Sequence, residues 1–360
     1  MTNNNRLFLD VHVIQTVPPS NINRDDTGSP KTAQYGGVRR ARVSSQAWKK
    51  AMRDYFNEYG TQKNVGVRTK DVVQYVADKI LKLDPNVLEN DAFNQAEKMI
   101  KGAGISTKDG KAKALFFISD VQAMELAQSA LDGITDKKLL QSILNDNPAI
   151  DIALFGRMLA DDPSLNEDAS AQVAHAISTH AIQTEFDFFT AVDDLSPEDN
   201  AGAGMLGTVE FNSSTLYRYA NVAVHEFYRQ LGDEEQTLNA LKLFIEAFAN
   251  SMPTGKSNTF ANQTLPQAIL ITVRNDRPVN LVSAFEEPVK PSKGYVSKSI
   301  EKLFKEFKNV EKFVREPKFT LYVTNYDVDD KGIGKEVLSL PAMLDEFYEA
   351  MGGLLIEQVE

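Results

Sequence analysis

Hydrophobic and polar residues alternate near the start of the chain, in the segment RLFLDVHVIQ at positions 6–15. A repeat of two residues is typical of a β-strand, so this segment is predicted to be a strand. The segment PPSNINRDDTGSP that follows is rich in proline, asparagine, aspartate and glycine, which predicts a turn-rich loop. Next comes YGGVRRARVSS, whose Val38, Arg40 and Arg42 are expected on one face of a second strand.

The segment SSQAWKKAMRDYFNEYG at positions 44–60 has the period of an amphipathic helix. Ser44 or Ser45 can cap its beginning, and Gly60 can end it. One stripe of this helix is apolar or aromatic and comprises Trp48, Met52, Tyr55, Phe56 and Tyr59. The opposite face is polar and basic and comprises Gln46, Lys49, Lys50 and Arg53. Such a face is usually only a solvated surface, but here it directly follows three arginines in the preceding strand.

The remainder of the chain alternates between helical and extended patterns. Residues 64–147 carry several helical repeats, which predict a helical insertion, and AIDIALFGRML then has an extended pattern. The segments AQVAHAISTHAIQTEFDFFTAV and MLGTVEFNSSTLYRYANVAV are predicted to form a long β-hairpin around the acidic, glycine-rich DDLSPEDNAGAG. Later elements are expected as a helix at 234–250, a strand at 267–274, a helix at 297–314, a strand at 319–324 and a helix at 341–352. This order of elements favours an α+β fold.

Composition excludes several classes of protein. The 360 residues include no cysteine, which excludes disulfides, thiolate metal sites and cysteine nucleophiles. No apolar run approaches the roughly 20 residues of a membrane-spanning helix, and the beginning of the chain lacks the pattern of a signal peptide. We therefore expect a soluble, cytoplasmic protein.

Charge is distributed unevenly along the chain. The net charge of −11 alone argues against nucleic acid as a ligand, because phosphate binding depends on lysine and arginine. However, residues 1–53 contain nine basic and three acidic residues, a net charge of +6, whereas the rest carries 30 basic and 47 acidic residues, a net charge of −17. We call residues 1–53 the basic island. A basic island in an acidic chain indicates a confined anion-binding site.

Other candidate sites in the sequence are weak. The four histidines, His12, His175, His180 and His225, are most simply packing or surface residues. The spacing of His175 and His180 does not allow these two to share a metal. The GKS triplet in PTGKSN lacks the earlier glycine of a phosphate-binding loop.

Six segments occur together and in order. They are NRDD at 23–26, YGGVRRARVSSQAWKKAMR at 35–53, DIALFGRM at 151–158, AHAISTH at 174–180, DFFTAVDDL at 187–195 and LYRYANV at 216–222. This combination resembles the CasC-type backbone subunit of Cascade, the type I-E CRISPR surveillance complex. After about residue 250 the resemblance is limited to length and alternation.

The resemblance implies an α+β protein shaped like a hand. An RRM-like (ferredoxin-like) palm would comprise residues 1–60 and 171–360, helical fingers residues 61–170, and a β-hairpin thumb residues 182–215 within the palm. Copies of such a protein polymerise along the guide crRNA, beside other Cascade subunits, and present the spacer for pairing with target DNA in antiviral defence. The family is a non-catalytic scaffold, so no cofactor, metal or catalytic residue is implied.

The resemblance also assigns RNA-binding residues. Positions that line the guide-RNA backbone in the family are matched by Arg24, Lys31, Ser44, Gln46, Lys49 and Arg53. From the same basic island we add Arg40, Arg42 and Lys50. A subunit that accepts every spacer is expected to contact phosphates and riboses, because these carry no sequence information. The helix start at Ser44–Ser45 would add backbone N–H donors for one phosphate.

A second group of residues is implied to bend the RNA. Phe189 and Val192 match apolar thumb residues that push a nucleotide out of the stack at regular intervals, with Met158 near the same kink. From the residues alone, the pair Phe188–Phe189 could equally belong to a core or serve as a stacking platform for bases.

A third group is implied to contact the DNA duplex. Lys137 and Lys138 match the beginning of a row of lysines on a finger helix. Gln141 and Leu144 stand where the later lysines of that row are expected. The loss of two phosphate contacts would reduce the salt dependence of DNA binding by about two units.

Two other functions stay open from the sequence. Asp25–Asp26 is the one adjacent acid pair in the basic island, and a magnesium-dependent, RNA-cleaving subunit would use Asp26, as related type III subunits do. Alternatively, the basic face binds an acidic protein partner. Cleavage of RNA that disappears in Asp26→Ala would favour the first alternative, and bound nucleic acid after purification would exclude the second.

Overall fold

The computed structural model describes residues 6–60, 65–159, 162–191, 205–291 and 293–359. Contacts within the chain define two compact units. The sheet unit comprises Met1–Met52, Val173–Asn221 and Phe244–Leu354, and the helical unit comprises Arg53–Gln172, Val222–Leu243 and Leu355–Glu360. The helical unit therefore includes residues 222–243, which the sequence analysis assigned to the palm.

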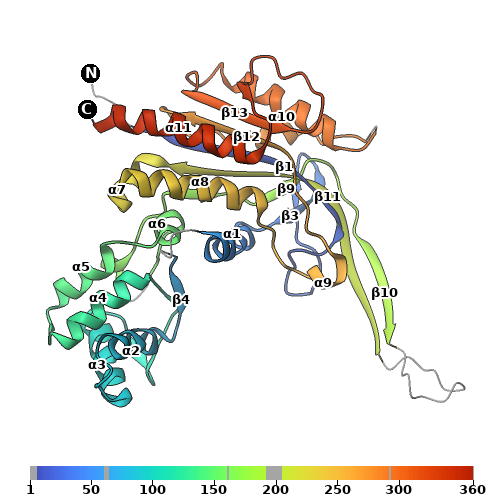
Figure 1. Cartoon of the computed structure of the whole chain (residues 1–360). Coiled ribbons are helices and arrows are strands. Elements are labelled where there is room, and N and C mark those ends of the chain that lie inside the picture. The colour runs from blue at the N-terminus through green and yellow to red at the C-terminus, as the bar shows by residue number, and fades with distance from the viewer. Residues whose placement is uncertain (1–5, 61–64, 160–161, 192–204, 292, 360) are drawn as a thin grey trace, which may run out of the picture. The chain divides into compact units, whose positions relative to one another are not determined.

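A mixed β-sheet forms the centre of the sheet unit (Figure 1). Its strands are ordered β14 (Lys335–Glu336), β13 (Phe319–Thr324), β12 (Pro266–Arg274), β1 (Phe8–Ser20), β11 (Met205–Ala223), β9 (Ala176–Ser178), β3 (Val38–Val43) and β2 (Thr32–Tyr35). Strand β1 pairs with β12 in antiparallel orientation, and β13 pairs with β14 in parallel orientation. The combination of this sheet with many helices confirms the predicted α+β class.

The helical segments that contribute to the sheet unit are α1 (Ser45–Tyr59), α8 (Glu234–Asn250), α9 (Ser257–Phe260), α10 (Val296–Val310), α11 (Leu340–Val359) and the short η3 (Val282–Phe285). Helices cover both faces of the sheet. Leu216 and Tyr217 are successive residues of β11, so their side chains point to opposite faces. Tyr217 packs in a cluster with Phe304 of α10, whereas Leu216 packs in a cluster with Trp48 of α1. Helices α10 and α1 therefore lie on opposite faces.

A buried arginine fixes α1 against its face of the sheet. The guanidinium of Arg218 in β11 lies 3.7 Å from the ring centre of Trp48 and 4.5 Å from that of Phe248 in α8. It also donates hydrogen bonds to the side chain of Gln15 and to the carbonyl of Phe248. Burial lowers the pKa of Arg218 to about 9. Because the aromatic stripe of α1 is held inward, the polar stripe of the same helix faces outward.

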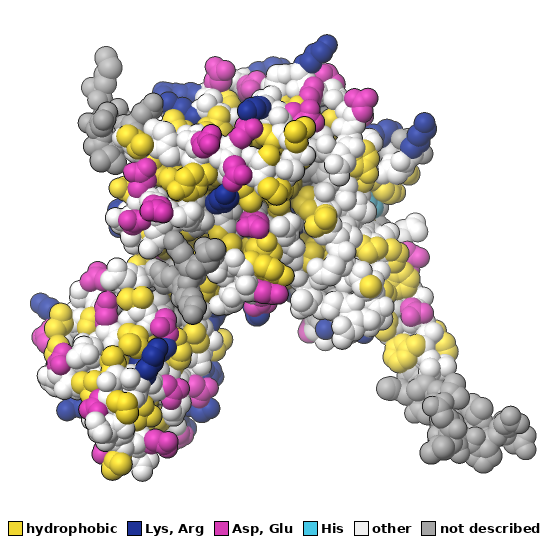
Figure 2. All heavy atoms as spheres, viewed as in Figure 1, with side chains coloured by type: hydrophobic (Ala, Val, Ile, Leu, Met, Phe, Trp, Pro, Cys, Tyr) yellow, Lys and Arg dark blue, Asp and Glu magenta, His cyan; other side chains and the backbone are white. Residues whose placement is uncertain are grey.

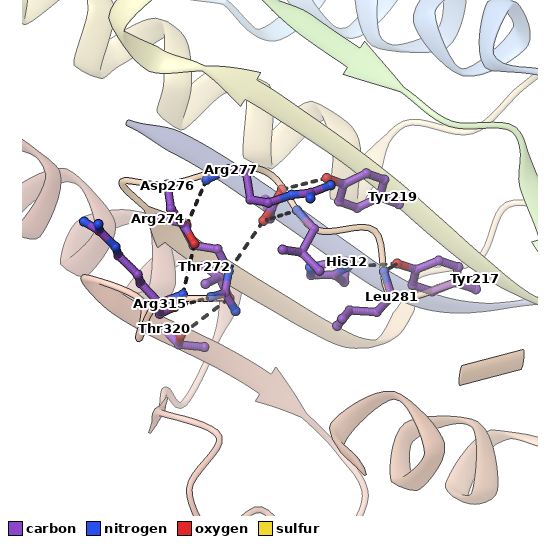
Figure 3. A network of polar contacts seen from close by, with 12 residues as sticks. His12, Tyr217, Tyr219, Thr272, Arg274, Asp276, Arg277, Leu281, Arg315 and Thr320 are labelled. Carbon is purple, nitrogen blue, oxygen red and sulfur yellow. Dashed lines mark hydrogen bonds and ion pairs between the residues drawn. The ribbon is translucent and has the colours of Figure 1, made fainter. Parts of the chain in front are cut away.

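The predicted strand at 6–15 corresponds to β1, whose residues Phe8–Gln15 are buried on both faces. The reason is its place in the middle of the sheet, where its polar side chains enter a hydrogen-bonded network (Figure 3). The carboxylate of Asp10 accepts hydrogen bonds from the Tyr219 hydroxyl at 2.7 Å and from the Val279 N–H at 3.1 Å. The guanidinium of Arg274 lies 3.9 Å from the same carboxylate. Burial nevertheless raises the pKa of Asp10 to about 7.

His12 belongs to the same network. Its Nδ1 lies 2.9 Å from the hydroxyl of Tyr217, which also accepts a hydrogen bond from the Leu281 N–H at 3.0 Å (Figure 3). Burial, with a smaller contribution from the positive charge of Arg274, lowers the pKa of His12 to about 3. His12 is thus a neutral packing residue, as the sequence analysis considered most probable for each histidine.

The helical unit has a core of its own. Its elements are α2 (Val72–Leu83), α3 (Glu89–Gly102), α4 (Asp120–Leu131), α5 (Lys137–Asn145), α6 (Ile150–Phe155), η1 (Pro163–Leu165) and α7 (Val224–Leu231), with the short strands β4 (Val67–Thr69), β5 (Thr107–Lys108), β6 (Lys111–Ala112) and β7 (Phe116–Ile118). Strand β8 (Ala171–Val173) instead pairs with β11 in the large sheet. Val76, Ile100 and Leu126, from α2, α3 and α4, are buried together in the core of this unit. The predicted helical insertion is thereby confirmed for most of residues 64–147.

Two segments of the helical unit differ from the prediction. The extended pattern of AIDIALFGRML is wrong for Ile150–Phe155, which form α6. Conversely, Phe116–Ile118 form strand β7 inside a segment that was predicted to be helical. Both are short, almost fully buried apolar runs, and such runs have no periodicity that separates a helix from a strand.

Candidate nucleic-acid interface

The loop between β1 and β2 is a well-ordered turn that presents Arg24 to solvent. Within it, the carboxylate of Asp25 accepts hydrogen bonds from the N–H groups of Thr27 at 2.9 Å and Ser29 at 3.0 Å. The hydroxyl of Thr27 donates a further bond at 2.7 Å, and these bonds lower the pKa of Asp25, with the Thr27 side chain as the largest cause. At the base of the loop, Asn21 donates to the carbonyls of Gly28 and Glu210. Arg24 is therefore exposed on a fixed turn.

Arg40 does not belong to this surface, and we withdraw it from the predicted RNA-binding residues. Its side chain is fully buried. The guanidinium donates to the carbonyls of Tyr35 at 3.1 Å, Ser178 at 3.0 Å and Phe285 at 2.7 Å. The Arg40 side chain points into the protein, so its positive charge is used to bind backbone carbonyls and is not presented to an external ligand.

Arg42 lies two residues further along β3 and is partly exposed. Its guanidinium donates to the carbonyl of Thr32 at 3.1 Å and lies 3.1 Å from Nδ1 of His175. The backbone N–H of Arg42 donates to the carbonyl of Lys31 at 2.9 Å, which holds these two basic residues on neighbouring strands. Neither the spacing of His175 nor its neighbours in the sequence signals this contact with β3.

The N-terminus of α1 is joined to the same loop. The Ser44 N–H donates to the side chain of Asn23 at 2.8 Å, and the Ser44 hydroxyl accepts from the Ala47 N–H at 3.3 Å. Of the two serines considered, Ser44 thus makes the capping contact. A cavity of about 20 Å³ lies beside these residues, and its lining includes Asn23, Lys31 and Arg42.

The outward face of α1 carries the predicted polar residues of the sheet unit. Gln46 and Lys50 are exposed, and Lys49 is partly buried, which lowers its pKa. On the inward stripe, Trp48 is fully buried. Tyr59, which was predicted to belong to the inward stripe, is 58% exposed.

Arg53 belongs to the helical unit and already has partners there. Its Nε donates to Oδ2 of Asp151 at 2.7 Å, and its Nη2 donates to the carbonyl of Gly66 at 3.0 Å. The guanidinium also lies 4.5 Å from the ring centre of Phe117. Burial raises the pKa of Asp151, and the hydrogen bond from Arg53 opposes this shift. Arg53 therefore has a structural role, and its contact with RNA stays a prediction.

The hairpin formed by β10 (Glu185–Ala191) and β11 exposes aromatic side chains. Phe186 and Phe188 are each 66% exposed on one face, and Phe189 is 40% exposed on the other. Apolar side chains are visible along this hairpin in Figure 2. Phe189 lies directly opposite Gly207, where an added Cβ would come within 2.3 Å of the phenyl ring. Because Gly207 has no side chain, the Phe189 ring can lie over it. Val192 lies outside the described residues.

Met158 is held outward in the helical unit, with 87% of its surface exposed. The residues on both sides are buried and anchored. The guanidinium of Arg157 donates to the carbonyls of Leu165 at 2.8 Å and Leu144 at 2.7 Å, and the Leu159 N–H donates to the side chain of Asn166 at 2.6 Å. An exposed methionine between two anchored neighbours is a fixed apolar projection, which is the property that a wedge requires.

The candidate DNA contacts lie at the beginning of α5. Lys137 and Lys138 are exposed, and the ammonium of Lys137 lies 3.1 Å from Asp162. Hydrogen bonds from Ser164 and Lys137 lower the pKa of Asp162 to about 2. The two later positions have other roles, since Gln141 donates to Asp162 at 2.9 Å and Leu144 is fully buried. The departure from a row of lysines thus has a structural reason.

Metal-ligand clusters and membrane-spanning helices are both absent from the described part of the chain. Among these residues, no group of three or more His, Cys, Asp or Glu side chains is placed to hold a metal ion. Over the same residues, every helix is too short or too polar to cross a membrane.

Comparisons with known proteins extend over nearly the whole chain. A family model described as CT1975-like protein matches residues 9–349. A chain from a solved structure named "CRISPR RNA-guided surveillance complex, pre-nicking" is 33% identical, with a TM-score of 0.85 over 95% of this chain and 99% of that one. A chain from another, named "CRISPR RNA-guided surveillance complex", is 28% identical, with a TM-score of 0.75 and the same two coverages. A search of curated proteins finds no match.

Proposed function

Because the chain belongs to the CT1975-like protein family, we propose that it is the non-catalytic backbone subunit of a CRISPR Cascade complex. The family match and the similarity to chains of surveillance complexes confirm the resemblance to the CasC-type subunit. In this role, copies of the chain polymerise along guide crRNA, kink it at regular intervals and present the spacer for pairing with target DNA in antiviral defence.

The observation that carries this proposal is the full-length similarity to surveillance-complex chains, which reaches a TM-score of 0.85. The surface of the basic island supports it, because Arg24, Gln46 and Lys50 are exposed in the sheet unit. These side chains project from a turn and a helix, and they suit the contacts with phosphates and riboses that a sequence-independent scaffold needs.

The finer fold assignment is part of the same proposal. The sheet unit corresponds to an RRM-like palm, the hairpin of β10 and β11 to a thumb, and the helices of the helical unit to fingers. In the thumb, Phe189 and Val192 act as wedges between nucleotides, and Met158 of the fingers serves the same kink. Lys137 and Lys138 contact the target duplex.

The proposed partners are guide crRNA, target DNA, other Cascade subunits and further copies of the chain in a head-to-tail filament. The charge distribution supports such a filament, because the acidic remainder of one copy complements the basic island of the next. We propose the cytoplasm as the location of this assembly, where CRISPR-guided defence meets invading nucleic acid.

RNA binding is tested by a pair of substitutions and a matched control. Arg24→Ala together with Lys50→Ala should weaken binding to single-stranded RNAs of different sequence by the same factor, because phosphate contacts carry no sequence information. Lys298→Ala together with Lys305→Ala removes the same charge from exposed positions of α10, on the opposite face of the sheet, and should leave affinity nearly unchanged. Equal weakening by both pairs, or weakening for selected sequences only, would contradict the proposal.

The non-catalytic role is tested separately. The full chain, incubated with RNA and magnesium, should leave the RNA intact. Cleavage that is lost in Asp26→Ala would instead establish the RNA-cleaving alternative.

A further inference from the structure

His175 and Arg42 form an exposed contact within the basic surface of the sheet unit. His175 directly precedes β9, and Arg42 of β3 is paired with Ile177 of β9, two residues beyond His175. Nη1 of Arg42 lies 3.1 Å from Nδ1 of His175. Lys31, whose carbonyl accepts a hydrogen bond from the Arg42 N–H, is close enough to act on the charge of the imidazole. The side chains of Arg42 and His175 are thus in contact, and the backbone of Lys31 is bonded to that of Arg42 beside them.

The contact determines which nitrogen of His175 carries the proton. Arginine has only donors, so Nδ1 must accept the hydrogen bond and the imidazole must be neutral with its proton on Nε2. Burial lowers the pKa of His175 first, and the positive charges of Arg42 and Lys31 lower it further. The charged groups of the described chain that act on this imidazole are therefore both cations, and β11 adds only the neutral Tyr219 carbonyl, which accepts from the Ala174 N–H.

We propose that Lys31, Arg42 and His175 form one phosphate site for the guide RNA, in which His175 takes up a proton as the phosphate binds. The proposal rests on the RNA-binding function above and adds a residue and a pH dependence to it. A phosphodiester carries one negative charge and several acceptor oxygens. Its oxygens can accept hydrogen bonds from Arg42, from Lys31 and from the imidazolium that forms when His175 takes up the proton.

Protonation changes the contact between the two side chains in a defined way. Once Nδ1 carries a proton it no longer accepts from Arg42, so the guanidinium is released and can donate to the phosphate. Two neighbouring cations repel one another without an anion between them, and therefore protonation and phosphate binding favour each other.

The consequence is an affinity that depends on pH. In the free chain the pKa of His175 lies below its ordinary value of 6.5, and a bound phosphate raises it. Binding therefore takes up a proton at pH values between the pKa of the free chain and the pKa of the complex, and affinity increases as the pH falls through this interval. One titrating group limits the change to about tenfold per pH unit.

The test measures binding of a fluorescent single-stranded RNA to the full chain by anisotropy at several pH values. Wild-type affinity should increase several-fold as the pH is lowered through the pKa that His175 has in the complex, and His175→Gln, which cannot take up a proton, should lose most of this increase. His225→Gln, in the helical unit, is the matched control and should retain it. His175→Arg carries a permanent charge and should bind at high pH as wild type does at low pH.

A second measurement uses the wild-type chain alone, so that it does not depend on the folding of a variant. The histidine side-chain NMR signals are titrated with and without RNA, and the pKa of His175 should rise when RNA is bound. The same pH dependence in His175→Gln, or an unchanged pKa of His175 with RNA bound, would overturn the proposal while RNA binding itself persists. A chain that fails to bind RNA at every pH would overturn the proposed function instead.

Discussion

Replacement of Phe189 by alanine separates a wedge from a core residue. Full burial of a phenylalanine side chain contributes about 1.5–3 kcal/mol. Because Phe189 is 40% exposed, its packing on the hairpin contributes about 1–2 kcal/mol, in a segment at the edge of the sheet unit. Phe304 of α10 is 1% exposed, and Phe304→Ala should cost about 3–5 kcal/mol of the free energy of unfolding. Thermal melting of the free chain should therefore change far less for Phe189→Ala.

The functional readout is chemical probing of RNA bound to the assembled chain. Wild type should produce reactive nucleotides at regular intervals, and Phe189→Ala should lose this periodic reactivity while RNA stays bound. Gly207→Ala provides an independent perturbation, since the new Cβ would come within 2.3 Å of the Phe189 ring and must displace it. We expect it to reproduce the loss without removal of the phenyl group.

The same experiment can refute the reasoning. A Phe189→Ala variant that melts as low as Phe304→Ala and keeps the periodic reactivity would assign Phe189 to packing. If the Phe189 ring is shown to move in Gly207→Ala and the periodic reactivity of the RNA persists, the position of the ring over Gly207 does not matter for RNA bending.

Substitution of three buried or partly buried polar groups should change the stability of the fold in measurable ways. Arg40→Ala should cost about 3 kcal/mol of the free energy of unfolding, because four buried or partly buried backbone carbonyls lose a donor. The folded protein should keep its RNA affinity, and a lower affinity per folded molecule would show that Arg40 does contribute to RNA binding. His12→Gln should be less stable than wild type at neutral pH. Below pH 6.5 the unfolded wild-type chain binds a proton at His12, whereas the native chain, with a His12 pKa of about 3, does not. The difference in free energy of unfolding between wild type and variant should therefore narrow by up to about 1.4 kcal/mol per pH unit as acid denaturation is followed below pH 6.5. Asp151→Ala should destabilise the helical unit by about 3 kcal/mol, since Arg53 loses its buried partner, and hydrogen exchange should locate faster opening there; unchanged exchange would argue that the pair contributes little.

Sequence patterns predicted the elements that bury one regular face. The helix expected at 234–250 is α8, and the strand expected at 319–324 is β13, both with the predicted bounds. A long helical period or a short alternating run is sufficient to predict the type of these two elements, because the surrounding structure reinforces the local preference. Short apolar runs without a period, such as Ile150–Phe155, offer no such signal, and their conformation depends on the core that they enter.

The candidate site could be predicted only in outline. Composition located the basic island, but it did not separate Arg40, which donates to four backbone carbonyls inside the sheet unit, from Arg42, which is partly exposed two residues later. Charge counts ignore such contacts, since a buried guanidinium and a free one have the same formal charge. His175 was missed for a related reason. Its partner Arg42 is 133 residues away in the sequence and reaches it only through the pairing of β3 with β9.

The most direct test of the scaffold proposal is native mass spectrometry of the full chain mixed with single-stranded RNAs of increasing length. A subunit that polymerises along a guide should add one chain at a time as the RNA becomes longer, with a constant number of nucleotides for each added chain and little dependence on sequence. The proposal predicts such a ladder of stoichiometries. A single chain bound to RNAs of every length, or no stable complex with any of them, would contradict it.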